Sequence, residues 1–416
     1  MSALLGAALL LGLELYLGQA QNRLHRAYTR ASHVPIIEAG GRTVFPAFVP
    51  WDMAFGRNVF SSEAGPVLPL TGLSGRLTGL CSASGKLLAF ESDEFGFRNR
   101  TGAHTQAQIA IIGDSFAQGY CVSDSVSVAG MVRRSFPSTL NLGVTGAGPL
   151  WDLAVLREYA GAVRPRRVVW LFFEGNDLQG VGIEAGGFLR HYLDPSYAQG
   201  LRSRQHLIDT LQSNRLDSLA DALLRPGAER FRRALLLKEI RARLGLNFRR
   251  SSVAAPSSAN AVGTEVDKLR RVLLLANETT AGWGGRILFV YLPERSRFGD
   301  ASDTPENNEA RRAEKEAVID AARAAGADVL DLVPVFAAWK KPLGLWDEAL
   351  IHYNARGYRL AADAIVGELM RLDHASAAVD GGNENPQRSV PAAAEDFWIP
   401  VERVTLSMVR RATSYR

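Results

Sequence analysis

Residues 109–119 read IAIIGDSFAQG, an isoleucine-rich apolar run that ends in Gly-Asp-Ser. An uninterrupted apolar run is typical of a strand buried on both faces, and Gly-Asp-Ser is typical of a sharp turn from a strand into a helix. Ser115 is therefore predicted at the carboxyl end of a central strand, the edge at which open α/β sheets bind ligands. Two interpretations of Ser115 are open at this point: a nucleophile, or part of an ordinary helix start in which Asp114 or Ser115 is the N-terminal cap.

Strand and helix patterns alternate on both sides of this stretch. Alternation at this period predicts a parallel sheet with right-handed crossovers and helices on both faces. Residues 178–263 interrupt the alternation with mostly helical patterns, and we interpret them as an insertion that shapes the substrate pocket. The predicted strands are 109–112, 140–142, 168–173, 286–292 and 329–332, and the predicted helices are 126–134, 150–162, 265–281, 307–325 and 355–372.

Three further motifs lie where predicted strands end or the last helix begins. Residues 141–149 read NLGVTGAGP, residues 170–177 read WLFFEGND, and residues 346–354 read WDEALIHYN. Gly-Asp-Ser, a glycine after the second strand, Gly-Asn-Asp and a late His occur in this order, which resembles the SGNH (GDSL-type) hydrolase superfamily. The resemblance covers about residues 86–372 without the insertion. It implies a flavodoxin-like α/β three-layer sandwich around a central parallel sheet, and serine-based ester chemistry that uses no metal or cofactor.

The resemblance implies a role for one residue of each motif. Ser115 matches the nucleophile and His352 the base that activates it, since an unassisted serine is a poor nucleophile. The backbone N–H of Ser115, the N–H of Gly146 and the side-chain amide of Asn176 match the donors that stabilise the oxyanion of the tetrahedral intermediate. Gly143 is the neighbouring alternative to Gly146.

The chain departs from the family pattern at the acid of the triad. Family members usually place Asp three residues before the His, and Ala349 stands there. We predict that Asp347 orients His352, with Glu348 as the alternative. If neither carboxylate reaches the imidazole, a backbone carbonyl would orient it and leave a Ser–His dyad.

The amino-terminal segment, residues 1–20, predicts a signal peptide or a membrane anchor. Residues 2–17 are mostly Ala, Leu and Gly, a run that is short for a spanning helix; a core helix is the third interpretation. Lys and Arg are absent before this run and follow it at Arg23, Arg26 and Arg30, opposite to the charge bias of exported chains. We nevertheless expect an exported or anchored chain with its catalytic domain in the periplasm or outside the cell.

The remaining segments flank a predicted hydrolase domain at 101–374. Residues 31–100 are rich in Gly, Pro and Ser and predict an extension of short strands and loops packed on that domain, with a turn at 93–99. Residues 375–416 predict a low-complexity tail, disordered to about residue 395, whose 397–408 portion either docks or does nothing. The two cysteines, Cys81 and Cys121, either form one disulfide or remain free thiols.

The charge and composition of the chain limit which binding partners are expected. The net charge of +5 and the basic helical pattern at 228–246 fit an acidic glycan or a membrane surface, or an ordinary solvated face, and no nucleic-acid motif occurs. We expect an acylated small-molecule or glycan substrate, with membrane association through the N-terminal segment as a further possibility. The predicted function is a serine esterase cleaving O-acyl, chiefly acetyl, esters. The alternatives are a polysaccharide O-acyltransferase and a catalytically silent glycan- or lipid-binding protein.

Overall fold

A computed structural model describes the chain at residues 37–39, 42–47, 59–63, 65–83, 86–224, 259–299, 305–347, 351–380 and 395–400. The predicted signal peptide or anchor, the basic pattern at 228–246, and Glu348 with Ala349 lie outside these ranges. No helix in the described ranges has the length and apolar character needed to cross a membrane.

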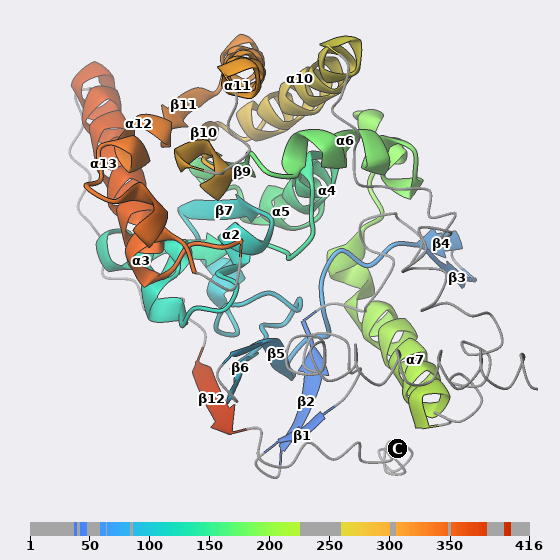
Figure 1. The fold of residues 1–416 in the computed structure, drawn as a ribbon. Helices are drawn as coiled ribbons and strands as arrows, with labels where there is room; N and C mark the ends of the chain where they lie inside the picture. The colour runs from blue at the N-terminus through green and yellow to red at the C-terminus, as the bar shows by residue number, and fades with distance from the viewer. Residues whose placement is uncertain are drawn as a thin grey trace, which may run out of the picture.

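A parallel five-stranded sheet forms the centre of the molecule (Figure 1). Its spatial order is β11-β10-β9-β7-β8, and every neighbouring pair is parallel. When the five strands are numbered by their order in the chain, this arrangement reads 2-1-3-4-5, as in flavodoxin-like folds. The order of the strands changes direction between the first and the third strand, β7 and β9. The predicted α/β fold is confirmed. The strands are β7 (Ile109–Gly113), β8 (Thr139–Asn141), β9 (Arg167–Phe173), β10 (Arg286–Leu292) and β11 (Asp328–Asp331).

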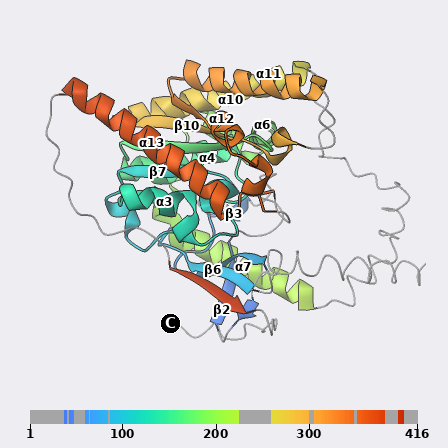
Figure 2. The same cartoon turned by 60° about the vertical axis from the view of Figure 1, so that its left-hand side comes forward.

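Helices cover both faces of this sheet and make three layers, as the two views in Figures 1 and 2 show. Successive residues of a strand point to opposite faces, so Ala110 and Ile112 pack under one helix layer while Ile109 and Ile111 pack under the other. The first layer contains α4 (Pro149–Val155), α10 (Ala259–Ala281) and α11 (Pro305–Ala324). The second contains α3 (Val128–Ser135), α12 (Val333–Ala337) and α13 (Ala355–Asp380).

The N-terminal extension forms a second sheet, of order β1-β2-β5-β6-β12, at the bottom of Figure 1. Its last strand comes from the far end of the chain and pairs antiparallel with β6. Part of the predicted tail therefore docks as a strand. The strands are β1 (Ile37–Ala39), β2 (Arg42–Pro46), β5 (Leu77–Ala83), β6 (Lys86–Glu91) and β12 (Asp396–Pro400), and a separate hairpin joins β3 (Phe60–Ser62) to β4 (Gly65–Val67).

The predicted start of disorder at residue 375 is wrong. Helix α13 continues to Asp380, because residues 375–380 include Ala375, Ala377 and Ala378, and alanine has the highest intrinsic helix propensity. Residues 381–394 lie outside the described ranges.

The insertion is mostly helical in its described portion. It contains α6 (Asp177–Ala185), two short 3-10 helices (Phe188–Leu193 and Leu201–Arg204) and α7 (Gln205–Leu224). Helix α7 contacts the N-terminal extension, where Asp209 accepts hydrogen bonds from Ser74 and Gln212 donates to the carbonyl of Thr71. Three further short helices, α2 (Ser115–Gln118), a π-helical turn (Leu156–Ala160) and α5 (Gly161–Val163), belong to the main domain.

Candidate active site

Ser115 is the first residue of α2, and only Asp114 separates it from the end of β7. Asp114 is the N-cap of α2, because its Oδ1 accepts the N–H of Phe116 at 2.8 Å. The capping interpretation of Ser115 is therefore wrong, and its hydroxyl is available for another partner. Gly113 makes the sharp turn possible, since its φ is +137° and a Cβ would lie 2.6 Å from the carbonyl oxygen of Leu171.

That other partner is His352, 237 residues further along the chain. Its Nε2 lies 2.7 Å from Ser115 Oγ, and both residues are only 8% exposed. His352 lies in a loop between Trp346 and Tyr353, and these two residues pair through a β-bridge. The N–H of Asp347 also donates to the carbonyl of His352 at 3.0 Å. The structure thus brings together the predicted nucleophile and base.

Burial and one nearby charge act in opposite directions on His352. Burial lowers the pKa of the imidazole to about 4, and the negative charge of Asp347 partly opposes this by raising it. Within the described residues Nδ1 has no hydrogen-bond partner. Asp347 therefore acts on His352 through its charge, and Glu348, the alternative acid, lies outside the described ranges.

In the loop after β8, Gly146 is exposed and Gly143 is buried. The N–H of Gly143 already donates to Asn141 Oδ1 at 2.9 Å, and a Cβ there would lie 2.3 Å from the backbone nitrogen of Gln118. Gly146 is exposed and has a φ of +82°, and a Cβ at this position would have no atom within 4 Å. Glycine is therefore required here by backbone conformation and not by space.

Asn176 is the N-cap of α6, at the end of β9. It is exposed, and its side chain hydrogen-bonds to the buried Asp114. Ser115 supplies a further donor at the same edge, because the first N–H groups of a helix have no acceptor within the helix. The three predicted donors thus follow the adjacent strands β7, β8 and β9.

Buried carboxyl groups accept hydrogen bonds from backbone N–H groups next to these loops. Asp177 Oδ2 accepts the N–H of Phe173 at 2.7 Å. Glu184, near the end of α6, accepts the N–H groups of Gly148 and Leu150 at 2.8 and 2.9 Å, and that of Trp151 at 3.3 Å. Sequence reasoning missed Glu184, because a glutamate on a helix gives no sign that it reaches the next loop.

The other histidines are separate from this pair. His104 lies in the 3-10 helix Ala103–Thr105 and is buried against Asp93, the first residue of the turn predicted at 93–99, with Nε2 and Oδ2 2.9 Å apart. His191, His206 and His374 lie on helices, and His25 and His33 fall outside the described ranges. Among the described residues no group of His, Cys, Asp or Glu is arranged to hold a metal ion.

The fold and this Ser–His pair define a class, the α/β ester hydrolases of the SGNH type. Residues 111–360, more than half of the chain, match the model of the GDSL-like Lipase/Acylhydrolase family. The chain belongs to this family and is an ester hydrolase.

Solved structures similar to the chain have low sequence identity to it. A lipase/acylhydrolase from Enterococcus faecalis is 14% identical with a TM-score of 0.35, and the match covers 64% of this chain and 95% of that one. An acetylxylan esterase from Geobacillus stearothermophilus is 14% identical with a TM-score of 0.35, covering 64% and 94%. A G-D-S-L family lipolytic protein from Veillonella parvula is 13% identical with a TM-score of 0.34, covering 63% and 98%. No curated protein matches the sequence.

Proposed function

We propose that this chain is a serine esterase that removes O-acyl groups, chiefly acetyl, from a glycan of the cell envelope or the extracellular space. The observation that carries the proposal is the 2.7 Å hydrogen bond between Ser115 Oγ and His352 Nε2 at the carboxyl edge of the sheet. The exposed Gly146 and Asn176 at the same edge support it.

In the proposed mechanism Ser115 Oγ attacks the ester carbonyl while His352 Nε2 takes its proton. The oxyanion that forms receives hydrogen bonds from the N–H groups of Ser115 and Gly146 and from the Asn176 amide. His352 then gives the proton to the departing alcohol, and an acyl-enzyme remains. Water, deprotonated by His352, releases the acid and restores Ser115.

Asp347 has a defined part in this mechanism. Burial keeps His352 neutral and able to accept a proton, but a buried imidazole is a weak base, and base catalysis is most efficient when the pKa lies near the working pH. The charge of Asp347 opposes the effect of burial and stabilises the imidazolium formed in the transition state. We therefore assign Asp347 as the acid of a Ser–His–Asp triad that acts by charge.

Two features support a substrate and location outside the cytoplasm. Cys81 and Cys121 form a disulfide, and disulfides persist mainly in oxidising compartments. The sequence pI of about 9.3 favours an acidic polysaccharide partner. We propose an exported or anchored protein, with membrane association through its N-terminal segment.

The test is hydrolysis of p-nitrophenyl acetate by the full chain, beside Ser115→Ala and His352→Ala. Both variants are expected to lose activity by roughly 10³-fold or more, because nucleophile and base act as one unit. Ser125→Ala, which removes a hydroxyl from an exposed serine close to the site in sequence, is the matched control and should keep full activity. Retained activity in Ser115→Ala would overturn the mechanism.

The substrate is tested with the same variants on acetylated polysaccharide, by release of free acetate. Acetate release that depends on Ser115 supports the glycan esterase. If acetate appears on an added glycan acceptor in place of free acetate, the same residues carry out acyl transfer and the hydrolase proposal fails at its last step.

A further inference from the structure

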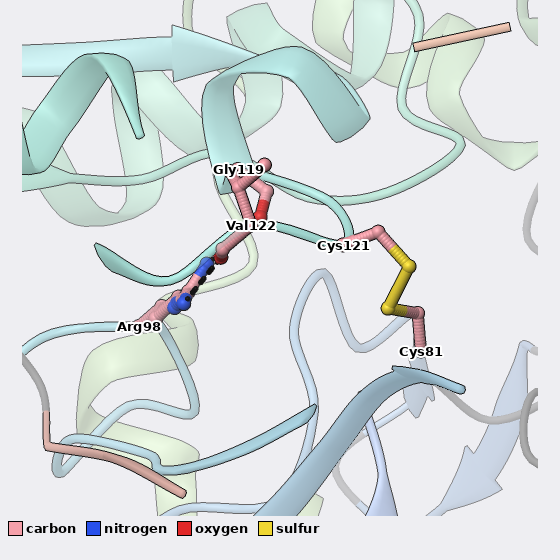
Figure 3. Close-up of a disulfide and its surroundings, with 5 residues drawn as sticks. All are labelled: Cys81, Arg98, Gly119, Cys121 and Val122. Carbon is pink, nitrogen blue, oxygen red and sulfur yellow. Dashed lines mark hydrogen bonds between the residues drawn. A yellow bond between two sulfur atoms is a disulfide. The ribbon is translucent and has the colours of Figure 1, made fainter. Parts of the chain in front are cut away.

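The segment directly after the nucleophile helix, residues 119–122, is fixed from two directions (Figure 3). Cys121 is bonded to Cys81 of β5 in the N-terminal sheet. Arg98, whose side chain is fully buried, donates to the carbonyls of Gly119 at 2.8 Å and Val122 at 2.9 Å. The N-terminal extension therefore holds both ends and the middle of segment 119–122.

Tyr120 lies within this segment and reaches the active site. On the extension side it packs on the small apolar cluster formed by Ala47, Leu80, Cys81, Leu88 and Phe90. Its ring also contacts the imidazole of His352, with centroids 4.7 Å apart and ring planes 33° apart. Tyr120 thus connects the N-terminal sheet to the base.

A second ring, that of Phe116, contacts the same imidazole at a centroid distance of 4.9 Å. Phe116 is completely buried and also packs on Phe173 and Tyr353, so the main domain fixes it. Tyr120 is only partly buried. Its backbone N–H donates to the carbonyl of Ser115 at 2.9 Å, and segment 119–122 also attaches it to the disulfide and to Arg98.

Orientation of the imidazole matters because a base must present Nε2 to the serine through the whole reaction. In the described residues no hydrogen bond to Nδ1 sets this orientation. Among the described residues, the rings of Phe116 and Tyr120 and the hydrogen bond to Ser115 are the contacts that fix the plane of the His352 imidazole.

We propose that Tyr120 is a positioning residue for His352, held in place by the Cys81–Cys121 disulfide, so that the N-terminal sheet is a working part of the active site. This inference rests on the proposed Ser–His mechanism. It makes turnover depend on a covalent bond that joins β5 to the nucleophile segment, outside the parallel sheet that carries the reacting groups.

The first test compares Tyr120→Leu with Tyr120→Phe in the full chain. Loss of the ring should lower kcat for p-nitrophenyl acetate by roughly tenfold or more with KM changed by less than about twofold, since a misplaced catalytic group raises the barrier without weakening ground-state binding. Tyr120→Phe keeps the ring and should recover most of kcat.

A matched control removes an aromatic ring far from the site. Trp283 is also partly buried, and its Nε1 donates to the carbonyl of Pro165 at 3.0 Å, at the edge where β9 and β10 begin. Trp283→Leu should leave kcat unchanged. Equal kcat in Tyr120→Leu and the unsubstituted chain would overturn the proposal.

The second test asks whether the disulfide acts through Tyr120. The pair Cys81→Ser and Cys121→Ser removes the bond without a thiol reductant, which would itself cleave the ester. We expect the pair to lower kcat in the parent chain but to cause little further loss in the Tyr120→Leu background, because two changes in one path are not additive. If the double serine substitution lowers kcat by the same factor in both backgrounds, the disulfide does not act through Tyr120. Circular dichroism at the assay temperature confirms that each variant is folded.

These measurements distinguish a failure of the serine mechanism from a failure of the positioning role of Tyr120. If Ser115→Ala keeps its activity, the serine mechanism and this inference both fail. If Ser115→Ala is inactive while Tyr120→Leu is unchanged, the mechanism stands and only the positioning role of Tyr120 is lost.

Discussion

Burial controls the protonation of the groups around Ser115. It raises the pKa of Asp114 to about 7 and that of Glu184 to about 7, and it raises the pKa of Asp152 and of Asp177 well above its ordinary value. The same burial lowers the pKa of His352 to about 4. Near neutral pH the base is therefore neutral, while Asp114 and Glu184 are close to their midpoints.

We expect the lowest step in the acid limb of kcat/KM to lie near pH 4, because the base must be unprotonated and its pKa is about 4. We assign any step of this profile near pH 7 to Asp114 or Glu184, because the pKa of each is about 7. In Asp347→Asn the lowest step should move to lower pH, since the negative charge of Asp347 raises the pKa of His352 and the variant lacks that charge. kcat should also fall, because the imidazolium loses its stabilising charge.

The control is Asp373→Asn, which removes a carboxylate that pairs with Arg166 on the surface. Its profile should match that of the parent chain. A step that stays in place or moves to higher pH in Asp347→Asn would refute the assignment of Asp347.

At the scale of elements, one side chain joins the two loops that carry Gly146 and Asn176, the proposed oxyanion donors. Helix α6 begins beside Asn176 and carries Glu184 near its end, and Glu184 accepts three N–H groups at the start of α4, directly after the loop of Gly146. A carboxylate at a helix N-terminus is favourable because of the exposed N–H groups and the helix dipole. The separation of Gly146 from Asn176 therefore depends on this contact.

Glu184→Gln should lower kcat roughly tenfold at about pH 8 with little change in KM, since it replaces charge-assisted hydrogen bonds and leaves an amide NH₂ facing backbone donors. The difference from the parent chain should shrink below pH 7, where Glu184 itself becomes protonated. Glu309→Gln, on the exposed face of α11, is the control. Equal kcat in Glu184→Gln and the control would show that the contact does not set the donors.

At the scale of the whole molecule, the two ends of the described chain meet in one sheet. Strand β12 pairs with β6, and Asp396 accepts a hydrogen bond from the buried Arg98 at 2.8 Å. Arg98 in turn binds segment 119–122 next to the nucleophile helix. The C-terminal strand therefore contributes to the support of the active site.

A chain that ends after Asp380 should be less stable than one that ends after Pro400, by about 3 kcal/mol, because the shorter chain leaves the buried Arg98 without its carboxylate. Urea unfolding followed by circular dichroism measures the difference. Asp396→Ala in the full chain isolates the ion pair and should reproduce most of it. Equal midpoints for the two truncations would show that β12 adds no stability.

Most elements of the main domain could be predicted from sequence. The isoleucine run at 109–112 and the apolar run at 168–173 are strands because both faces are covered, and β10 has the bounds expected for it. The second sheet was predicted only as short strands and loops, since β12 and β6 are separated by about 300 residues and their pairing leaves no local pattern.

The sequence by itself determined the parallel sheet and the edge at which Ser115 lies, because hydrophobic period and turn residues are local properties of the chain. The roles of Ser115 and His352 were implied by the resemblance of their motifs to the SGNH superfamily. Only the tertiary structure decided that Cys81 pairs with Cys121, and that Glu184 and Tyr120 reach the site. These contacts join residues from separate elements. They depend on how packed layers fix side-chain distances, and nothing in the neighbouring sequence specifies that.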